Sequence, residues 1–200
     1  MASVLHGYDV ASHQNSLIRA NEKWITDYPD FLIVKVSEGK NYIFGQAADY
    51  LKKARTAGTE IGMYHYARAD LGNSAKDEAK AFIEQVSPWG DAVYALDVEG
   101  KNLMLPTIDG WCRNWLDYVY EATGRKGLLY ISQGQVKKFQ KVCAGNYGLW
   151  VAHYDVAKPA SVAPWPFWAI WQYHVNKGQG IDENIFNGNL RMWKKYAGKV

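Results

Sequence analysis

Two acidic residues, Asp97 and Glu99, stand two positions apart at the end of an apolar run, Ala92–Val98, that is predicted to be a strand. Side chains alternate between the faces of a strand, so the two carboxylates share one face with Cβ atoms roughly 7 Å apart. Repulsion and partial burial raise the pKa of at least one of them. A carboxyl that stays protonated near neutral pH can donate a proton to a glycosidic oxygen. The alternative is a solvated strand end where Asp97 caps a turn.

Two further acids occupy comparable positions. Asp9 closes the first predicted strand, Val4–Val10, and Asp182 lies near the last one, around Ile181–Ile185. The first and last strands of a closed barrel are neighbours, and barrel active sites form where the strands end. We therefore expect Asp9 and Asp182 to converge with the first pair of carboxylates at one mouth.

Glu38 and His65 are less decisive candidates. Glu38 follows the run Phe31–Val36 and has two interpretations, a hydrogen bond to substrate or an ion pair with Lys35. His65 has the chemistry of a general base, but a buried, hydrogen-bonded histidine is the interpretation we favour. The neighbouring Tyr64 suits a sugar platform and a core position equally.

Strand and helix patterns alternate through the first two thirds of the chain, which favours parallel β/α units. The other predicted strands are Ile61–Ala67, Leu128–Ser132, Tyr147–Tyr154 and Phe167–Tyr173, and the predicted helices are Ala47–Ala57, Ser74–Val86, Pro106–Thr123 and a short one near Gln135–Val142. About eight strands indicate an irregular, compact (β/α) barrel of the α/β class. A regular barrel typically needs about 250 residues, so we expect few or short helices in the last third of these 200 residues. An open doubly wound sheet is the alternative.

Seven short motifs in order resemble glycoside hydrolase family 25, the Chalaropsis-type lysozymes of phage endolysins and bacterial autolysins. They are Gly7–Gln14, Lys35–Gly39, Gly62–Tyr66, Leu96–Glu99, Leu149–Tyr154, Trp171–Tyr173 and Ile181–Gly188. In the first motif Ala11 replaces the usual serine. Each motif is weak alone, but the ordered series spans nearly the whole chain and is specific.

The resemblance implies a peptidoglycan muramidase, which cleaves the β-1,4 bond between N-acetylmuramic acid and N-acetylglucosamine. It implies Glu99 as the general acid and base, with Asp97, Asp9 and Asp182 around it. Candidate substrate-binding residues are Tyr64, Glu38, Tyr130, Trp150, Tyr154 and Gln172. We expect residues 1–200 to form one catalytic domain without a separate wall-binding domain, acting as a monomer.

Composition excludes several other classes. A net charge of +3 without a basic cluster argues against nucleic-acid binding. No metal-ligand spacing or Gly-rich phosphate loop is present, so we expect neither a metal nor a cofactor. The two cysteines, Cys112 and Cys143, are expected to be free thiols, with a single bridge as the alternative. The nine tryptophans and 14 tyrosines suit sugar binding, although most of them are expected in the core.

The opening segment Met1–His6 lacks the pattern of a signal peptide, and no apolar run approaches the roughly 18 residues of a membrane span. We therefore expect synthesis in the cytoplasm without a signal peptide, no membrane insertion, and action on the bacterial wall after release, for example by phage-driven lysis.

Two competing functions remain for comparison. Chitinase-like enzymes carry D-x-D-x-E on the corresponding strand, and Ala95 at the first position counts against that class. A non-catalytic glycan-binding barrel would lack one of the acids, and none is missing. Both remain alternatives that differ from a muramidase in their action on bacterial walls.

Overall fold

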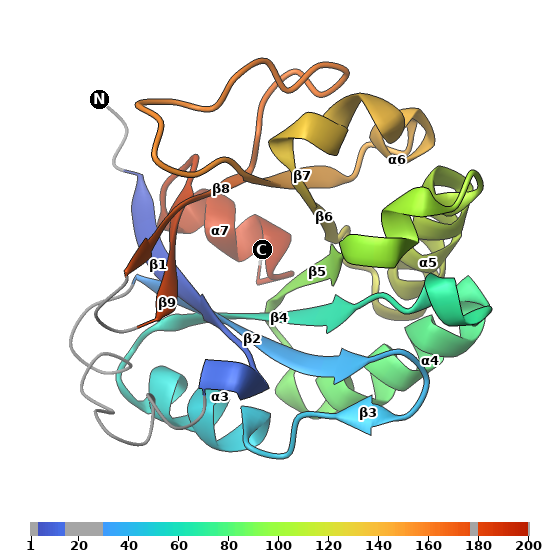
Figure 1. Cartoon of the computed structure of the whole chain (residues 1–200). Coiled ribbons are helices and arrows are strands. Elements are labelled where there is room, and N and C mark those ends of the chain that lie inside the picture. Colours follow the sequence, from blue (N-terminus) through green and yellow to red (C-terminus); the bar gives the residue numbers. More distant parts are fainter. Residues whose placement is uncertain (1–3, 15–29, 177–179, 200) are drawn as a thin grey trace.

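A closed barrel of eight strands forms the centre of the molecule (Figure 1). The structure, a computed structural model, describes residues 4–14, 30–176 and 180–199, so Met1–Ser3 of the opening segment lie outside it. The strands are β1 (Leu5–Val10), β2 (Phe31–Glu38), β3 (Tyr42–Ile43), β4 (Glu60–Tyr66), β5 (Val93–Asp97), β6 (Leu128–Ser132), β7 (Gly148–Ala152), β8 (Ile170–Asn176) and β9 (Ile181–Phe186). The barrel class is therefore confirmed.

The ring closes because β1 pairs with β2 in parallel and with β9 in antiparallel fashion. β9 also runs antiparallel to β8, whereas β2 and β4–β8 follow one another in parallel. The short strand β3 only extends β2 as a hairpin. An antiparallel strand starts at the mouth where its parallel neighbours end. This direction brings Asp182, at the start of β9, to the same mouth as Asp9.

Helices cover the outside of the barrel (Figure 1). They are α3 (Ala47–Thr56), α4 (Ala75–Val86), α5 (Ile108–Thr123) and α6 (Gln140–Ala144), and α7 (Leu190–Tyr196) follows the last strand. Ser74 caps α4, since its Oγ accepts a hydrogen bond from the Asp77 amide at 3.1 Å. Segment 153–169, all of it described, contains no helix, so the predicted shortage of helix late in the chain is confirmed.

The two faces of β5 pack against different parts of the core. Val93 and Ala95 belong to the apolar cluster inside the barrel, and Tyr94 and Leu96 belong to the larger cluster beneath the helices. The inner face therefore continues directly into the acidic end of the strand at Asp97. Burial of both clusters supplies the main favourable free energy of folding.

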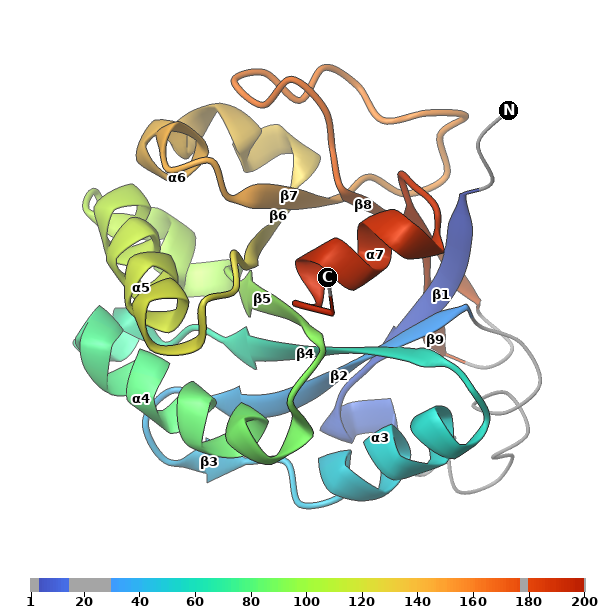
Figure 2. The ribbon, with the colours of Figure 1, turned by 180° about the vertical axis from the view of Figure 1, so that it is seen from behind.

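Helix α7 fills the other end of the barrel, and sequence patterns did not reveal it (Figure 2). Its Trp193 is fully buried and stacks on Phe31 at the start of β2, with ring centroids 4.4 Å apart. Trp193 also meets Phe186, at the end of β9, edge to face at 5.2 Å. These rings close the floor of the barrel, and among the described residues the pocket opens at the opposite end.

One predicted strand begins and ends three residues later in the structure than expected. We expected Phe167–Tyr173, and β8 spans Ile170–Asn176 instead. Phe167 lies in the preceding loop and is 56% exposed. The aromatic residues Phe167 and Trp168 made the segment resemble the beginning of a buried strand.

Both cysteines are free thiols, as expected. No helix among the described residues is long and apolar enough to cross a membrane.

Candidate active site

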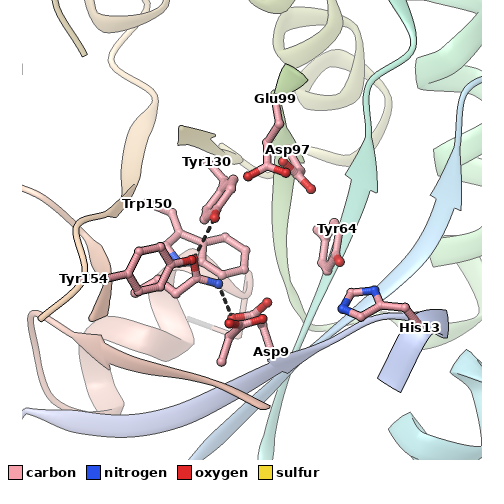
Figure 3. Close-up of a pocket in the computed structure, with 10 residues that line it drawn as sticks. Asp9, His13, Tyr64, Asp97, Glu99, Tyr130, Trp150 and Tyr154 are labelled. Carbon is pink, nitrogen blue, oxygen red and sulfur yellow. Dashed lines mark hydrogen bonds between the residues drawn. The ribbon is translucent and has the colours of Figure 1, made fainter. Parts of the chain in front are cut away.

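A pocket of about 200 Å³ opens at the mouth of the barrel (Figure 3). Its lining residues are Asp9, His13, Tyr64, Asp97, Glu99, Tyr130, Trp150, Tyr154, Gln172 and Asp182. The pocket thus brings together four carboxyls, four aromatic rings and two other polar side chains. Nine of these ten residues are candidates from the sequence; His13 is the additional one.

The backbone after β5 explains how Asp97 and Glu99 come to lie together. Asp97 is the last residue of the strand, and Glu99 keeps an extended conformation with φ −138° and ψ 176°. Side chains therefore continue to alternate beyond the ladder, and both carboxyls face the pocket (Figure 3). Gly100 then adopts φ +58°, a left-handed conformation that turns the chain away.

The second pair of acids comes from the strands that close the barrel. Asp9 and Asp182 are direct register partners on β1 and β9. Opposite residues of an antiparallel pair lie close enough for their side chains to interact. Figure 3 shows Asp9 across the pocket from Asp97 and Glu99.

Burial raises the pKa of all four carboxyls. For Asp97, burial and the charge of Glu99 raise the pKa well above its usual value, against the opposing charge of Lys35. Burial also raises the pKa of Glu99, although a hydrogen bond with Tyr130 and the charge of Lys35 oppose this. Burial raises the pKa of Asp182 to about 6, opposed by a hydrogen bond from Gln14. Burial therefore shifts the titration of the carboxyls in this pocket toward neutral pH, as a proton donor in catalysis requires.

Asp9 is held by amide groups. Its pKa is raised by burial and by Asp182, and its Oδ2 accepts hydrogen bonds from Gln172 Nε2 and Asn184 Nδ2, both at 2.7 Å. Gln172 Oε1 accepts from the hydroxyls of Tyr130, at 2.7 Å, and Tyr154. The network fixes Asp9 and two of the aromatic walls relative to one another.

The hydrogen bonding of Asp97 is incomplete. Its Oδ1 is buried and has no hydrogen-bond partner among the described residues. An unpaired buried acceptor is costly, and such atoms concentrate at functional sites. A ligand N–H or O–H entering the pocket would supply the missing partner.

Glu38 lies outside this pocket. Its Oε2 accepts a hydrogen bond from Lys35 Nζ at 2.6 Å and its Oε1 accepts one from Arg68 at 2.9 Å. The structural alternative, pairing with Lys35, is therefore confirmed. Glu38 instead lines an adjacent hollow beside Glu99.

His65 is fully buried on the outer side of β4, as the favoured interpretation predicted. Its Nδ1 meets Ser37 Oγ at 2.8 Å and its Nε2 meets Glu78 Oε2 at 2.9 Å. Burial lowers its pKa, and its ring stacks on Trp115 with centroids 5.5 Å apart. His65 therefore connects β4 to α4 and α5 rather than reaching the pocket.

The sequence-based candidates omitted three polar residues of this mouth. His13 lines the pocket, Asn184 holds Asp9, and Gln14 donates to Asp182 Oδ2 at 3.4 Å. His13 and Gln14 follow the first strand by a few residues, so the strand-end argument applied to Asp9 would also have found them. Among the described residues, no cluster of three or more His, Cys, Asp or Glu side chains has the arrangement of a metal site.

Comparisons with known proteins point in one direction. A family model described as glycosyl hydrolases family 25 matches residues 8–180. The chain is similar to an autolytic lysozyme of Clostridium acetobutylicum, with 31% identity over 137 residues, 65% of this chain and 40% of that protein. Its fold matches a bacterial lysozyme from Streptomyces coelicolor with a TM-score of 0.84, at 23% identity over 99% of each chain. A family GH25 lysozyme from Aspergillus fumigatus matches with a TM-score of 0.79 and 25% identity, over 98% of this chain and 99% of that one.

Proposed function

This chain belongs to glycosyl hydrolases family 25, and on that premise we propose that it is a lysozyme acting on bacterial peptidoglycan. It hydrolyses the β-1,4 bond between N-acetylmuramic acid and N-acetylglucosamine, with Glu99 as general acid and base. The observation that carries the proposal is the pair Asp97 and Glu99, whose pKa values are raised by burial at the mouth of an aromatic-walled barrel.

The direction from which the carboxyls approach the sugar bears on the mechanism. A simple acid–nucleophile pair flanks the scissile bond, whereas Asp97 and Glu99 leave the same strand end on the same face. We therefore assign Asp97 to the substrate's N-acetyl group rather than to the anomeric carbon. Its unpaired Oδ1 suits the N–H of that group.

Substrate-assisted cleavage then proceeds in two steps. The acetamido oxygen bonds to the anomeric carbon while the bond to the leaving oxygen breaks and Glu99 gives that oxygen its proton. Asp97 stabilises the positive charge that develops on the acetamido nitrogen. A water molecule next attacks the anomeric carbon and gives a proton to Glu99. The bond between the anomeric carbon and the acetamido oxygen breaks in the same step, which restores the N-acetyl group. Such mechanisms are known exceptions to the two-carboxylate scheme.

This mechanism predicts retention of the anomeric configuration without a covalent sugar–enzyme adduct. Two displacements at one carbon restore the β configuration, and neither forms a bond to the protein. Proton NMR of fresh product, recorded before mutarotation, checks the configuration, and mass spectrometry of enzyme quenched in turnover checks for an adduct. Initial α product would eliminate the mechanism, and a glycosyl ester on Asp97 would identify that residue as the nucleophile.

Digestion of purified Gram-positive walls tests the function itself. The proposal predicts a fall in turbidity with the release of new reducing ends. A non-catalytic glycan-binding barrel would bind the walls and leave both quantities unchanged. A chitinase-like enzyme would release reducing ends from chitin oligosaccharides in preference to walls.

A further inference from the structure

A second hollow, of about 450 Å³, adjoins the active site at the mouth of the barrel. Its walls come from the end of β2, the segment after β4 and the 3-10 turn Gly100–Met104 that follows β5. Gly100 directly follows Glu99 in the chain and lines the hollow. The hollow therefore lies close enough to Glu99 for one substrate molecule to reach both.

The charged side chains of this hollow nearly balance, in contrast to those of the acid pocket. Glu38 accepts hydrogen bonds from Lys35, at 2.6 Å, and from Arg68, at 2.9 Å. Arg68 also donates to Asp70 at 3.0 Å, so two carboxylates and two cations neutralise one another. Lys101 is exposed and has no ion-pair partner within the part of the chain that the structure describes. The hollow thus carries one positive charge in excess.

Hydrogen bonds hold the turn that carries Lys101 at a fixed place relative to Glu99. The buried Asn102 donates through Nδ2 to the carbonyl oxygens of Ala67, at 2.8 Å, and Glu99, at 3.0 Å. Its Oδ1 accepts from the Asp70 amide at 3.1 Å. Hydrogen bonds therefore connect the turn that carries Lys101 both to the segment after β4 and to Glu99. A preformed site of this kind costs little ordering on binding.

Resting on the proposed function, we propose that this hollow binds the acidic stem peptide carried by muramic acid, with a peptide carboxylate next to Lys101. The sugar rings of the polymer are uncharged, because the lactyl carboxyl of muramic acid is joined to the peptide as an amide. The free carboxylates therefore belong to the peptide. The positive charge of Lys101 attracts such a group.

Binding of soluble, uncross-linked glycan strands tests this inference in the Glu99→Gln background, where turnover does not interfere. Strands with stem peptides are compared with the same strands after an amidase has removed the peptides and the lactyl carboxyls exposed by this cleavage have been converted to neutral amides. Lys101→Glu is expected to raise Kd for stem-bearing strands about two- to fivefold, the upper part of the range for an exposed charge pair. High salt should shrink the difference because the charges are screened. Lys52→Glu, an exposed lysine on α3, is the matched control and should leave Kd unchanged.

Three results would overturn the inference: an equal rise of Kd on both kinds of strand, equal behaviour of Lys101→Glu and Lys52→Glu, and a difference that persists undiminished at high salt. Failure of the proposed function is a separate outcome. It would be seen as stem-dependent binding that responds to Lys101→Glu in a protein whose wild-type form releases no reducing ends from either strand.

Discussion

The substitution Glu99→Gln is expected to slow wall hydrolysis by at least about 10²- to 10⁴-fold, the range contributed by general acid–base catalysis. Glutamine keeps the shape of the side chain, but it supplies no proton. The melting temperature should therefore not fall. Initial rates of reducing-end release from purified walls, together with thermal unfolding of the same preparations, measure both quantities.

Glu183→Gln is a suitable control for Glu99→Gln. Glu183 lies beside Asp182 on β9, but its carboxylate accepts a hydrogen bond from Tyr173 at 2.8 Å and does not line the pocket. It should retain wall hydrolysis of the wild-type order. Near-normal lysis by pure Glu99→Gln protein would remove Glu99 from the acid role.

The substitution Asp97→Asn should have two opposite effects. It should slow hydrolysis by about 10²- to 10³-fold, the usual cost of removing one preorganised electrostatic partner of the transition state. It should also raise the melting temperature at neutral pH. Burial and Glu99 raise the pKa of Asp97, so the native state holds its proton to a higher pH than the unfolded chain does.

The sign of the pH dependence follows from proton linkage. Below the unfolded pKa both states carry the proton, and Asp97 costs the native state nothing. As the pH rises through the raised native pKa, the unfolded state is increasingly favoured. Asparagine has no charge to bury, so its advantage should be present at pH 7 and absent near pH 3. Equal melting temperatures of variant and wild type at pH 7, or an unimpaired rate, would contradict the assignment of Asp97.

The central part of the site could be predicted from local patterns. The alternation Val93, Ala95, Asp97 gave the inner face of β5, and strand-end reasoning predicted the convergence of Asp9 and Asp182. The first prediction depends on a rule that acts over a few residues, and the second depends on closure of the barrel. The direction of β9 was not predictable in this way, because a short run such as Ile181–Phe186 has the same pattern in either direction.

Contacts between distant residues account for what the sequence did not show. The amides that hold Asp9 come from Gln172 and Asn184, which lie 163 and 175 positions away. Gln172 is a candidate from its motif and Asn184 lies in the last motif, but no local pattern shows that their amides reach Asp9. Helix α7 was missed for a related reason: it has only seven residues, and its burial depends on Trp193 meeting Phe31 across the barrel floor.

The identity of the new reducing sugar is the most direct test of the proposed muramidase activity. Walls digested by the wild-type protein are reduced with borohydride, hydrolysed and analysed for sugar alcohols. A muramidase leaves the reducing end on muramic acid, so the account predicts muramicitol, with none formed by Glu99→Gln. Glucosaminitol alone would show that the enzyme cleaves the other glycosidic bond and would contradict the account.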